Sequence, residues 1–560
     1  MRNRTGETKY LFIFVLLLFC YYMYSIGHIY GFELIPDEFG YWTYAATLSG
    51  CDWSDIVSIG SYYSFGYTLI LYPIFRLFKD SIYAYRAAVT INFMLIIIAY
   101  AVLMRIIMAF QKEKKVSHAA LISGIAILYP SWLYYSRSTM TEILVMSMYV
   151  VICMLMNQYL EKGKKKVLIA LILSLVYIYT VHMRTIGIVI AACITLTVQM
   201  VTHWKRSKKT QVLLIIIFGI GLFLTATQIK SYITGNIYTD NAQQMITYND
   251  YSGQISKIKG IFSLTGIRNL MISFVCKVWY LGLASFGLFY WGIAFCVKRL
   301  KEHKKLIYLF ILLATAGEIA VTAIYTTGVG GRIDGLTYGR YNEQILPVLM
   351  ALGCMAVMQS TKAVKPSVMI AGLQLPVLVL ILYLIRRYDQ TNIHAYMILG
   401  ISYLFNEQTF EPLSYHITAY VLSVILMAVV IMILRIGQKK SLPILLAIIM
   451  TIELLLGMRL AAIFSENTQM ANFRDIQLIN IVEQQQEEHN RLVYVQEGDR
   501  GFADYLQFRL RDAQIELLYD DSELTDDDLI VTDYLYSGIE KLKIKYANWK
   551  ILGHLAVFYN

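Results

Sequence analysis

Charged residues are scarce in this sequence: they make up 16% of the 560 residues, whereas 57% of the residues are hydrophobic. This balance excludes an ordinary water-soluble protein and predicts a chain for which lipid is the main solvent. The sequence also lacks internal repeats and low-complexity tracts. We therefore expect a polytopic α-helical membrane protein.

The seven cysteines show no C-x-x-C spacing, and all but Cys51 lie in or beside apolar segments. Such cysteines are small packing residues, so neither a disulfide framework nor a zinc site is indicated. The net charge of +11 does not indicate a nucleic-acid partner, because the basic residues form short clusters between apolar segments. Clusters in these positions set the orientation of membrane spans.

About thirteen apolar segments are long enough to be membrane spans, at roughly twenty residues each. They lie at residues 10–30, 82–110, 117–134, 140–159, 167–183, 185–203, 211–229, 276–297, 306–326, 344–361, 366–386, 416–436 and 442–463. Every second connection is basic, as at 112–115 and 162–166. The positive-inside rule then places the N-terminus in the cytoplasm and, with an odd count, the C-terminus outside the plasma membrane. Arg2, Arg4 and Lys9 precede the first span, which we interpret as a retained signal anchor.

The outer connections are the long ones, at residues 31–81, 230–275, 327–343 and 387–415. An apolar segment at 62–79 is too short for a span and would disturb the alternation of basic connections. We expect it to form an interfacial helix beside another that begins at Asp37.

The composition changes after the transmembrane domain, residues 1–463, and becomes polar and acidic over residues 464–560. This last part has a helical pattern at 473–488 and another at 501–511. Short β-like runs occur at 491–495, 515–519, 529–532 and 551–559. The pattern predicts a small extracytoplasmic α/β domain.

Ionisable side chains gather at the outer ends of the predicted spans. On insertion scales each costs about 2.5 to 3.5 kcal/mol inside a bilayer, so their positions are informative. They are Asp37, Glu38, Arg86, Arg137, Glu142, His182, Arg184, Lys277, Arg332, Asp334, Arg340 and Glu343. Snorkelling at a helix end explains any one of them alone. Their recurrence at several outer turns favours a shared polar cleft.

Asp37 and Glu38 directly follow the first span. Successive side chains on a helix diverge by about 100°, so the two carboxylates are expected to have different partners. Asp37 shares a helix face with Tyr41 and Tyr44, whereas Glu38 faces Trp42. One acid could accept a proton while the other orients a partner or binds a cation. Helix-start preferences alone also explain two acids after a proline.

Read together with four other motifs, this acidic pair resembles the GT-C superfamily of membrane glycosyltransferases. The other motifs are Tyr129-Pro130-Ser131, Glu142, His182-Met183-Arg184-Thr185 and Tyr338-Gly339-Arg340-Tyr341-Asn342-Glu343. The similarity covers roughly residues 1–360. It is closest to the protein O-mannosyltransferase-like and lipid A aminoarabinose transferase-like branch.

The resemblance implies inverting transfer of a sugar from a polyprenyl-phosphate donor to an acceptor hydroxyl on the outer face of the membrane. Asp37 matches the first-loop acid of the family and is the implied general base, with Glu38 and Glu142 as further catalytic acids. Arginine suits the phosphate of the donor because it can form two parallel hydrogen bonds. The implied phosphate-binding residues are Arg184 and Arg340, followed by Lys277, Arg332 and Arg137. The expected cleft residues are Tyr41, Tyr44, His182, Tyr338, Tyr341 and Glu343.

The chain departs from the family in the first outer loop, where residues 62–67 replace a basic-Pro-Pro segment. The resemblance leaves a divalent cation cofactor open, because relatives differ in this respect. The expected partners are the lipid-linked donor, membrane lipids and a glycan, lipid or protein acceptor of the cell envelope. An alternative is a transporter of lipid-linked oligosaccharide or small solutes, which would need polar groups near mid-membrane such as Glu318 and Glu453. A second alternative is an envelope scaffold in which the acids serve only for solvation.

Overall fold

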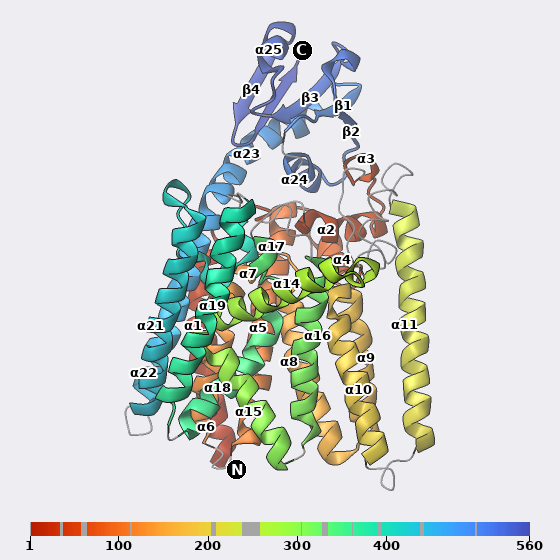
Figure 1. Cartoon of the computed structure of the whole chain (residues 1–560). Coiled ribbons are helices and arrows are strands. Elements are labelled where there is room, and N and C mark those ends of the chain that lie inside the picture. Colours follow the sequence, from red (N-terminus) through yellow and green to blue (C-terminus); the bar gives the residue numbers. More distant parts are fainter. Residues whose placement is uncertain are drawn as a thin grey trace.

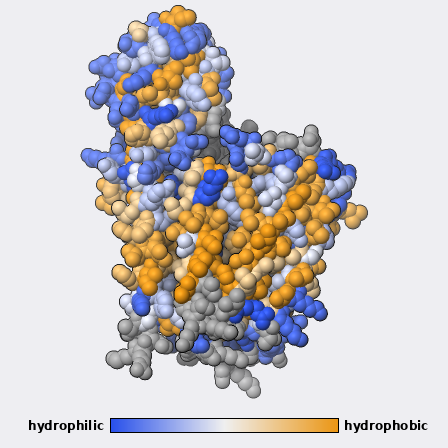
Figure 2. Space-filling view, turned by 90° about the vertical axis from the view of Figure 1, so that its left-hand side faces the viewer, coloured by the Kyte–Doolittle hydropathy of each residue, from blue (hydrophilic) through white to orange (hydrophobic). Residues whose placement is uncertain are grey.

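The structure is a computed structural model that describes residues 2–33, 37–57, 64–111, 115–202, 209–237, 258–303, 305–326, 334–360, 362–388, 394–436, 442–498 and 501–560. Figure 1 shows a bundle of long helices with a small domain above it, and the N-terminus at the opposite end of the bundle. The face of the bundle shown in Figure 2 carries a broad apolar belt, whereas the small domain is more hydrophilic. The chain is a multi-pass membrane protein.

The bundle contains the long helices and the shorter ones that pack among them. They are α1 (Arg2–Ile26), α5 (Ser81–Phe110), α6 (Val116–Ile127), α7 (Pro130–Tyr135), α8 (Glu142–Lys162), α9 (Lys165–Val181), α10 (Ile186–Thr202), α11 (Lys209–Ile237), α14 (Leu264–Ala284), α15 (Leu288–His303), α16 (Leu306–Tyr325), α18 (Leu346–Gln359), α19 (Val364–Tyr388), α21 (Pro412–Ile436) and α22 (Leu442–Phe464).

Ten helices within the described ranges are long and apolar enough to cross a membrane. Nine of them match expected spans over most of their length, and the tenth, α14, overlaps only the first part of the span expected at 276–297. The other three expected spans, at 117–134, 167–183 and 344–361, match shorter helices. The first of these is α6 followed by α7, because Tyr129, with φ −48° and ψ 129°, leaves the helical conformation before Pro130. A residue that precedes proline disfavours the helical conformation, so the chain bends there.

The expected span at 276–297 is wrong as a single helix. It falls on two helices, because α14 ends at Ala284 and α15 begins at Leu288. Between them Phe286 and Gly287 have φ values of 50° and 78°, in the left-handed region that stops a right-handed helix. Figure 1 shows α14 running obliquely across the bundle and α15 continuing towards the end that carries the N-terminus. The expected outer loop at 230–275 accordingly contains the last turns of α11 and the first part of α14.

Short helices lie at the end of the bundle next to the small domain. They are α2 (Asp37–Leu48), α3 (Ser54–Val57), α4 (Thr68–Leu77), η1 (Met183–Thr185), α17 (Asp334–Thr337), η2 (Glu343–Ile345), η3 (Ala395–Met397), α20 (Leu399–Ser402) and η4 (Glu407–Thr409). The expected helix at 62–79 is present as α4, and α2 begins at Asp37 as predicted. Helix α2 packs against α4.

The small domain has a five-stranded sheet with strand order β2-β1-β3-β5-β4. Its elements are α23 (Glu466–Gln485), β1 (Arg491–Val495), α24 (Gly501–Arg509), β2 (Ile515–Leu518), η5 (Asp521–Glu523), β3 (Asp528–Asp533), α25 (Ile539–Lys545), β4 (Asn548–Leu552) and β5 (Leu555–Tyr559). Strand β1 is parallel to β2 and β3, whereas β5 is antiparallel to β3 and β4. The predicted α/β domain is present, with the run at 551–559 forming parts of two strands rather than one.

The domain is bonded directly to the first outer loop of the bundle. The indole N–H of Trp53 donates to the Arg511 carbonyl (2.9 Å), and the Ser81 hydroxyl donates to the Phe508 carbonyl (2.6 Å). The Asn472 amide in α23 donates to the Phe32 carbonyl (3.2 Å). The domain therefore covers the loop that carries Asp37 and Glu38.

Candidate active site

Asp37 and Glu38 occupy the first turn of α2, where acidic side chains are stabilised by the helix dipole. The two carboxylates have different partners, as predicted from helix geometry. Glu38 is fully buried and accepts hydrogen bonds from the Tyr85 hydroxyl (2.7 Å) and from the Thr139 backbone N–H and hydroxyl (both 2.6 Å). The Asp37 side chain keeps 25% exposure. Glu38 thus fixes the start of α2, and Asp37 is the more accessible acid.

Arg340 joins Asp37 to a second carboxylate. Its Nη1 lies 2.7 Å from Asp37 Oδ2, and its Nε lies 2.9 Å from Glu142 Oε1. The backbone N–H groups of Gly339 and Arg340 both donate to the Met397 carbonyl, which holds the turn in place. A side chain at position 339 would collide with the ring of Tyr280. The Gly-Arg step is therefore dictated by packing, and it directs the guanidinium between two acids.

Arg184 approaches the same Glu142 oxygen from η1, at 3.4 Å. The guanidinium groups of Arg184 and Arg340 lie 4.4 and 5.6 Å from the centroid of the Tyr341 ring. Cations over an aromatic face are stabilised by its quadrupole, so Tyr341 contributes to holding two like charges close together. We call Asp37, Glu142, Arg184 and Arg340 the Asp37 cluster.

Two polar atoms of the Asp37 cluster have no partner among the described residues. They are Glu142 Oε2 and Arg184 Nε, and both are buried. Leaving such atoms unbonded costs free energy, about 1 to 3 kcal/mol for a neutral group and more for a charged one. One acceptor and one donor are thus available to a ligand, next to an ion-paired acid and two cations.

Glu343 lies in a separate cage of hydroxyl groups. Its Oε1 accepts hydrogen bonds from Tyr129 (2.9 Å), Ser131 (3.1 Å) and Tyr280 (2.5 Å). These contacts connect the Tyr129-Pro130-Ser131 motif to the turn that carries Arg340. Glu343 therefore positions the turn that carries Arg340.

The other expected cleft residues surround Tyr341 and α2. The rings of Tyr338 and His182 lie 4.7 and 5.6 Å from the Tyr341 ring. The Tyr41 hydroxyl lies 3.3 Å from the Thr141 hydroxyl, beside Glu142, and Tyr44 is fully buried. Desolvation by burial, reinforced by Arg184 and Arg340, lowers the pKa of His182 well below its ordinary value. His182 is therefore a neutral neighbour of the two arginines.

Two expected phosphate-binding residues lie away from the Asp37 cluster. Arg137 contacts Glu33 Oε1 (3.3 Å) and the Ser465 hydroxyl (3.0 Å). Lys277, in the middle of α14 and not at the start of a span, donates to Ser273, to Thr326 and to the Gly335 carbonyl at 2.6 to 3.1 Å. Arg332 lies outside the described residues. Of the five expected cations, the structure brings together Arg184 and Arg340.

Sequence reasoning missed Glu33, which with Arg137 and Ser465 forms a group that we call the Glu33 cluster. The Ser465 hydroxyl donates to Glu33 Oε1 at 2.5 Å, so the cluster connects the first outer loop to the junction between α22 and α23. Burial raises the pKa of Glu33, although the neighbouring Arg137 acts in the opposite direction. The signal in the sequence that could have identified Glu33 is its position only four residues before Asp37. Within the described ranges no group of three or more His, Cys, Asp or Glu side chains could hold a metal ion.

No family model and no curated protein matches this sequence. Among solved structures, the fold is similar to ArnT from Cupriavidus metallidurans, in the apo state (TM-score 0.53, 13% identity) and bound to undecaprenyl phosphate (TM-score 0.54, 12% identity). Both comparisons cover 98% of each chain. The arabinosyltransferase EmbB from Mycobacterium smegmatis gives a TM-score of 0.44 at 11% identity, over 81% of this chain and 41% of its own.

The similarity to ArnT extends over the helical bundle and the small domain, because the alignment covers nearly the whole of both chains. At this identity it establishes the architecture. The resemblance predicted from the short sequence motifs is thereby confirmed at the level of fold. The chain has the fold of ArnT from Cupriavidus metallidurans.

Proposed function

We propose that this chain is a membrane glycosyltransferase that moves a sugar from a polyprenyl-phosphate donor to an acceptor hydroxyl of the cell envelope, with inversion at the anomeric carbon. The observation that carries the proposal is the Asp37 cluster, in which Arg340 bridges Asp37 and Glu142 at 2.7 and 2.9 Å. An accessible acid beside two buried arginines is suited to deprotonating a hydroxyl and binding a phosphate at one site.

In this proposal Asp37 is the general base. Its carboxylate accepts the proton of the acceptor hydroxyl as the oxygen forms a bond to the anomeric carbon. The bond from that carbon to the phosphate oxygen breaks, and the polyprenyl phosphate leaves with the electron pair. The partial exposure of Asp37 supports this role, because a general base must reach a substrate that enters from outside.

Arg340 and Arg184 are the proposed phosphate-binding residues. Each guanidinium offers parallel N–H donors that match phosphate oxygens, and the Arg184 Nε lacks a partner among the described atoms. When the donor phosphate binds, Arg340 can exchange its contact with Asp37 for one with a phosphate oxygen, which frees the base for the acceptor. The unpaired Glu142 Oε2 would accept a hydrogen bond from a hydroxyl or amino group of the sugar or acceptor.

The donor class is supported by the fold and by charge. ArnT, which has a similar fold, has been solved with undecaprenyl phosphate bound. We carry a lipid-linked phosphate over to this chain because its buried arginines lie in a bundle surrounded by an apolar belt, as Figure 2 shows for one face. The end of the bundle next to the small domain is then the outer one.

The test is transfer from radiolabelled polyprenyl-phosphate sugars in membranes that contain the wild type or Asp37→Asn. We expect label to move from the lipid fraction to an acceptor with the wild type and not with Asp37→Asn. Asp55→Asn is the matched control, since Asp55 is an exposed acid in α3 of the same loop. Equal transfer by wild type and Asp37→Asn would refute Asp37 as the base. Movement of intact lipid-linked sugar across the membrane without transfer would instead favour the transporter.

A further inference from the structure

A cavity of about 930 Å³ lies at the end of the bundle opposite to the small domain, away from the Asp37 cluster. It is bordered by one side of α15 from Trp291 to Glu302, the last turns of α18, the end of α5 and the first two turns of α6. Ligand sites in proteins commonly span roughly 300 to 1,000 Å³. The cavity therefore has the size of a binding site.

The inner wall of the cavity is apolar. Trp291, Phe295 and Met355 line it and are 8%, 5% and 2% exposed. The Trp291 indole N–H donates to the Ser367 hydroxyl, so the polar edge of this ring is satisfied within the protein. A ligand that fills the inner part of the cavity must present hydrocarbon to this wall.

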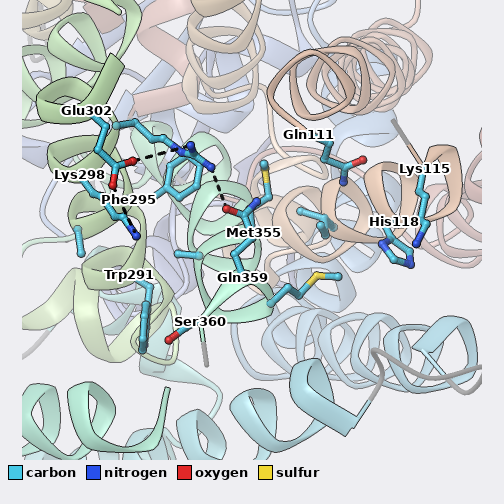
Figure 3. Close-up of a pocket in the computed structure, with 15 residues that line it drawn as sticks. Gln111, Lys115, His118, Trp291, Phe295, Lys298, Glu302, Met355, Gln359 and Ser360 are labelled. Carbon is cyan, nitrogen blue, oxygen red and sulfur yellow. Dashed lines mark hydrogen bonds and ion pairs between the residues drawn. The ribbon is translucent and has the colours of Figure 1, made fainter. Parts of the chain in front are cut away.

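The rim of the cavity is charged and mostly basic. Figure 3 shows Lys115 and His118 on one side of the cavity and Lys298 and Glu302 on the other. Lys298 Nζ and Arg299 Nη1 lie 3.8 and 3.9 Å from carboxylate oxygens of Glu302. One carboxylate therefore pairs with two cations, and both distances are longer than a hydrogen bond. With Lys115, the described lining contains three cations and one carboxylate.

The dipoles of the neighbouring helices also act on the cavity. The first turn of α6 borders the cavity, and the N–H groups of a helix start favour an anion. The ends of α5, α15 and α18 have the opposite polarity, which the basic side chains offset. Arg299 also donates to the side-chain oxygen of Gln359 in α18 at 3.0 Å, which holds its guanidinium across the cavity.

We infer that this cavity binds the phosphate-bearing headgroup of an acidic membrane phospholipid, with its hydrocarbon against Trp291, Phe295 and Met355. Charge complementarity selects an anion, and the apolar wall within a membrane-embedded bundle selects a lipid over a free phosphate ion. Basic pockets between helices at the cytoplasmic end of a bundle are a recognised form of anionic-lipid site. The inference concerns a site separate from the proposed glycosyl transfer.

The test measures lipid retained by the purified full-length protein in native mass spectrometry, with phosphatidylglycerol or phosphatidylcholine added to the detergent. We expect the wild type to retain phosphatidylglycerol selectively. In the triple variant Lys115→Gln, Lys298→Gln, Arg299→Gln, retention should fall by on the order of a hundredfold, because each basic residue near a charged headgroup contributes about 1 kcal/mol.

Two control variants separate the cavity from general charge and from misfolding. Lys164→Gln, Lys165→Gln, Lys166→Gln removes three exposed charges at the connection between α8 and α9, at the same end of the bundle, and should retain phosphatidylglycerol like the wild type. Lys115→Arg, Lys298→Arg, Arg299→Lys keeps the charge of the cavity and should also retain it.

Three results would overturn the inference. They are equal retention of phosphatidylglycerol and phosphatidylcholine by the wild type, equal losses in the two glutamine variants, and loss of retention in the charge-conserving variant. A further arm adds inorganic phosphate in excess over the lipid. Displacement of phosphatidylglycerol by inorganic phosphate alone would show that the cavity binds the free ion, contrary to the lipid assignment.

Discussion

Two ion clusters lie at the end of the bundle next to the small domain. Both pair carboxylates with arginines, but they differ in how far their side chains are exposed. In the Glu33 cluster the acid and the arginine are 0% and 6% exposed, and Ser465 contacts both of them, while Glu33 Oε2 has no partner among the described residues. In the Asp37 cluster Arg340 and Glu142 are equally buried, but Asp37 is 25% exposed and two atoms lack partners in the described structure. We call the Glu33 cluster closed, because none of its side chains is exposed, and the Asp37 cluster open, because Asp37 is accessible to a ligand.

The position of each cluster agrees with this difference. The Glu33 cluster joins the first outer loop and the turn after α7 to the junction of α22 and α23, from which the small domain continues. The Asp37 cluster joins turns that begin or precede helices α2, α8 and α10 and the segment before α18. Burying an ion pair is costly unless its geometry is good, so neither cluster is explained by stability alone. We therefore propose that the first cluster attaches the domain and that the second takes part in the proposed transfer.

Substituting one acid in each cluster is the sharpest test of this comparison. We expect Asp37→Asn to lower the rate of sugar transfer by about 10²- to 10⁴-fold, because a general base contributes that much. Glu33→Gln should keep the transfer rate per folded molecule within about threefold of the wild type, since a glutamine oxygen still accepts from Arg137 and Ser465. The measurement is initial rate of transfer, normalised to monodisperse protein. A loss with Glu33→Gln as large as that with Asp37→Asn would contradict the division of roles.

Removing the arginine of the closed cluster should instead reduce stability. We expect Arg137→Met to lower the free energy of unfolding by about 3 to 5 kcal/mol, because Glu33 is left buried without its cation. The measurement is the denaturation midpoint of the purified protein in lipid nanodiscs. Arg386→Met is the control, since Arg386 is an exposed residue at the end of α19. Full stability of Arg137→Met would mean that the cluster does not fasten the domain.

The arginine of the open cluster should be sensitive to a change that keeps its charge. Arg340→Lys retains one cation but cannot contact Asp37 and Glu142 with separate nitrogens in fixed geometry. We expect transfer to slow by about 10²- to 10³-fold, the usual effect of losing one donor that stabilises developing charge. Steady-state kinetics with varied donor is the measurement, and Arg387→Lys on exposed α19 is the control. An unchanged rate would show that Arg340 serves only to pair the acids.

The features of the fold and of the site that depend on local sequence pattern could be predicted from the sequence. Alternating basic connections and apolar lengths located the helices, and the short β-like runs located β1 to β3 nearly to the residue. Helix geometry separated Asp37 from Glu38. The resemblance to GT-C proteins, and not spacing, singled out Arg184 and Arg340.

Other features depend on contacts between residues far apart in sequence. Arg137 and Arg340 are both arginines in outer turns, and nothing local indicates that one pairs with Glu33 and the other with Asp37 and Glu142. The break between α14 and α15 rests on the left-handed conformation of Phe286 and Gly287, in a segment whose hydropathy is continuous. The cavity at the end of the bundle opposite to the small domain is formed by four helices, and its lining residues share no sequence motif.

A third ion cluster, in the solvent-exposed small domain, gives the weakest of the expected effects. Arg491 in β1 contacts Asp528 in β3 at 2.7 Å and Glu516 in β2 at 2.9 Å. Burial acts to raise the pKa of Asp528, but hydrogen bonds from Arg491 and Thr525 outweigh it and lower the pKa. A lowered pKa means that this interaction stabilises the domain above the ordinary aspartate pKa of 3.8 and is lost as the pH falls through the folded-state value.

Asp528→Asn should therefore destabilise the β1–β3 pairing by about 1.5 to 3 kcal/mol at neutral pH, as expected for a charged hydrogen bond. It should also flatten the loss of stability below the ordinary aspartate pKa, because asparagine does not titrate. Hydrogen exchange of β1 and β3 peptides in the full-length chain, corrected for the intrinsic pH dependence, measures both effects. Glu516→Gln should change exchange little, since its partner contact is exposed. Parallel pH profiles for the wild type and Asp528→Asn would remove Asp528 as the titrating group and leave acid sensitivity to the two buried clusters.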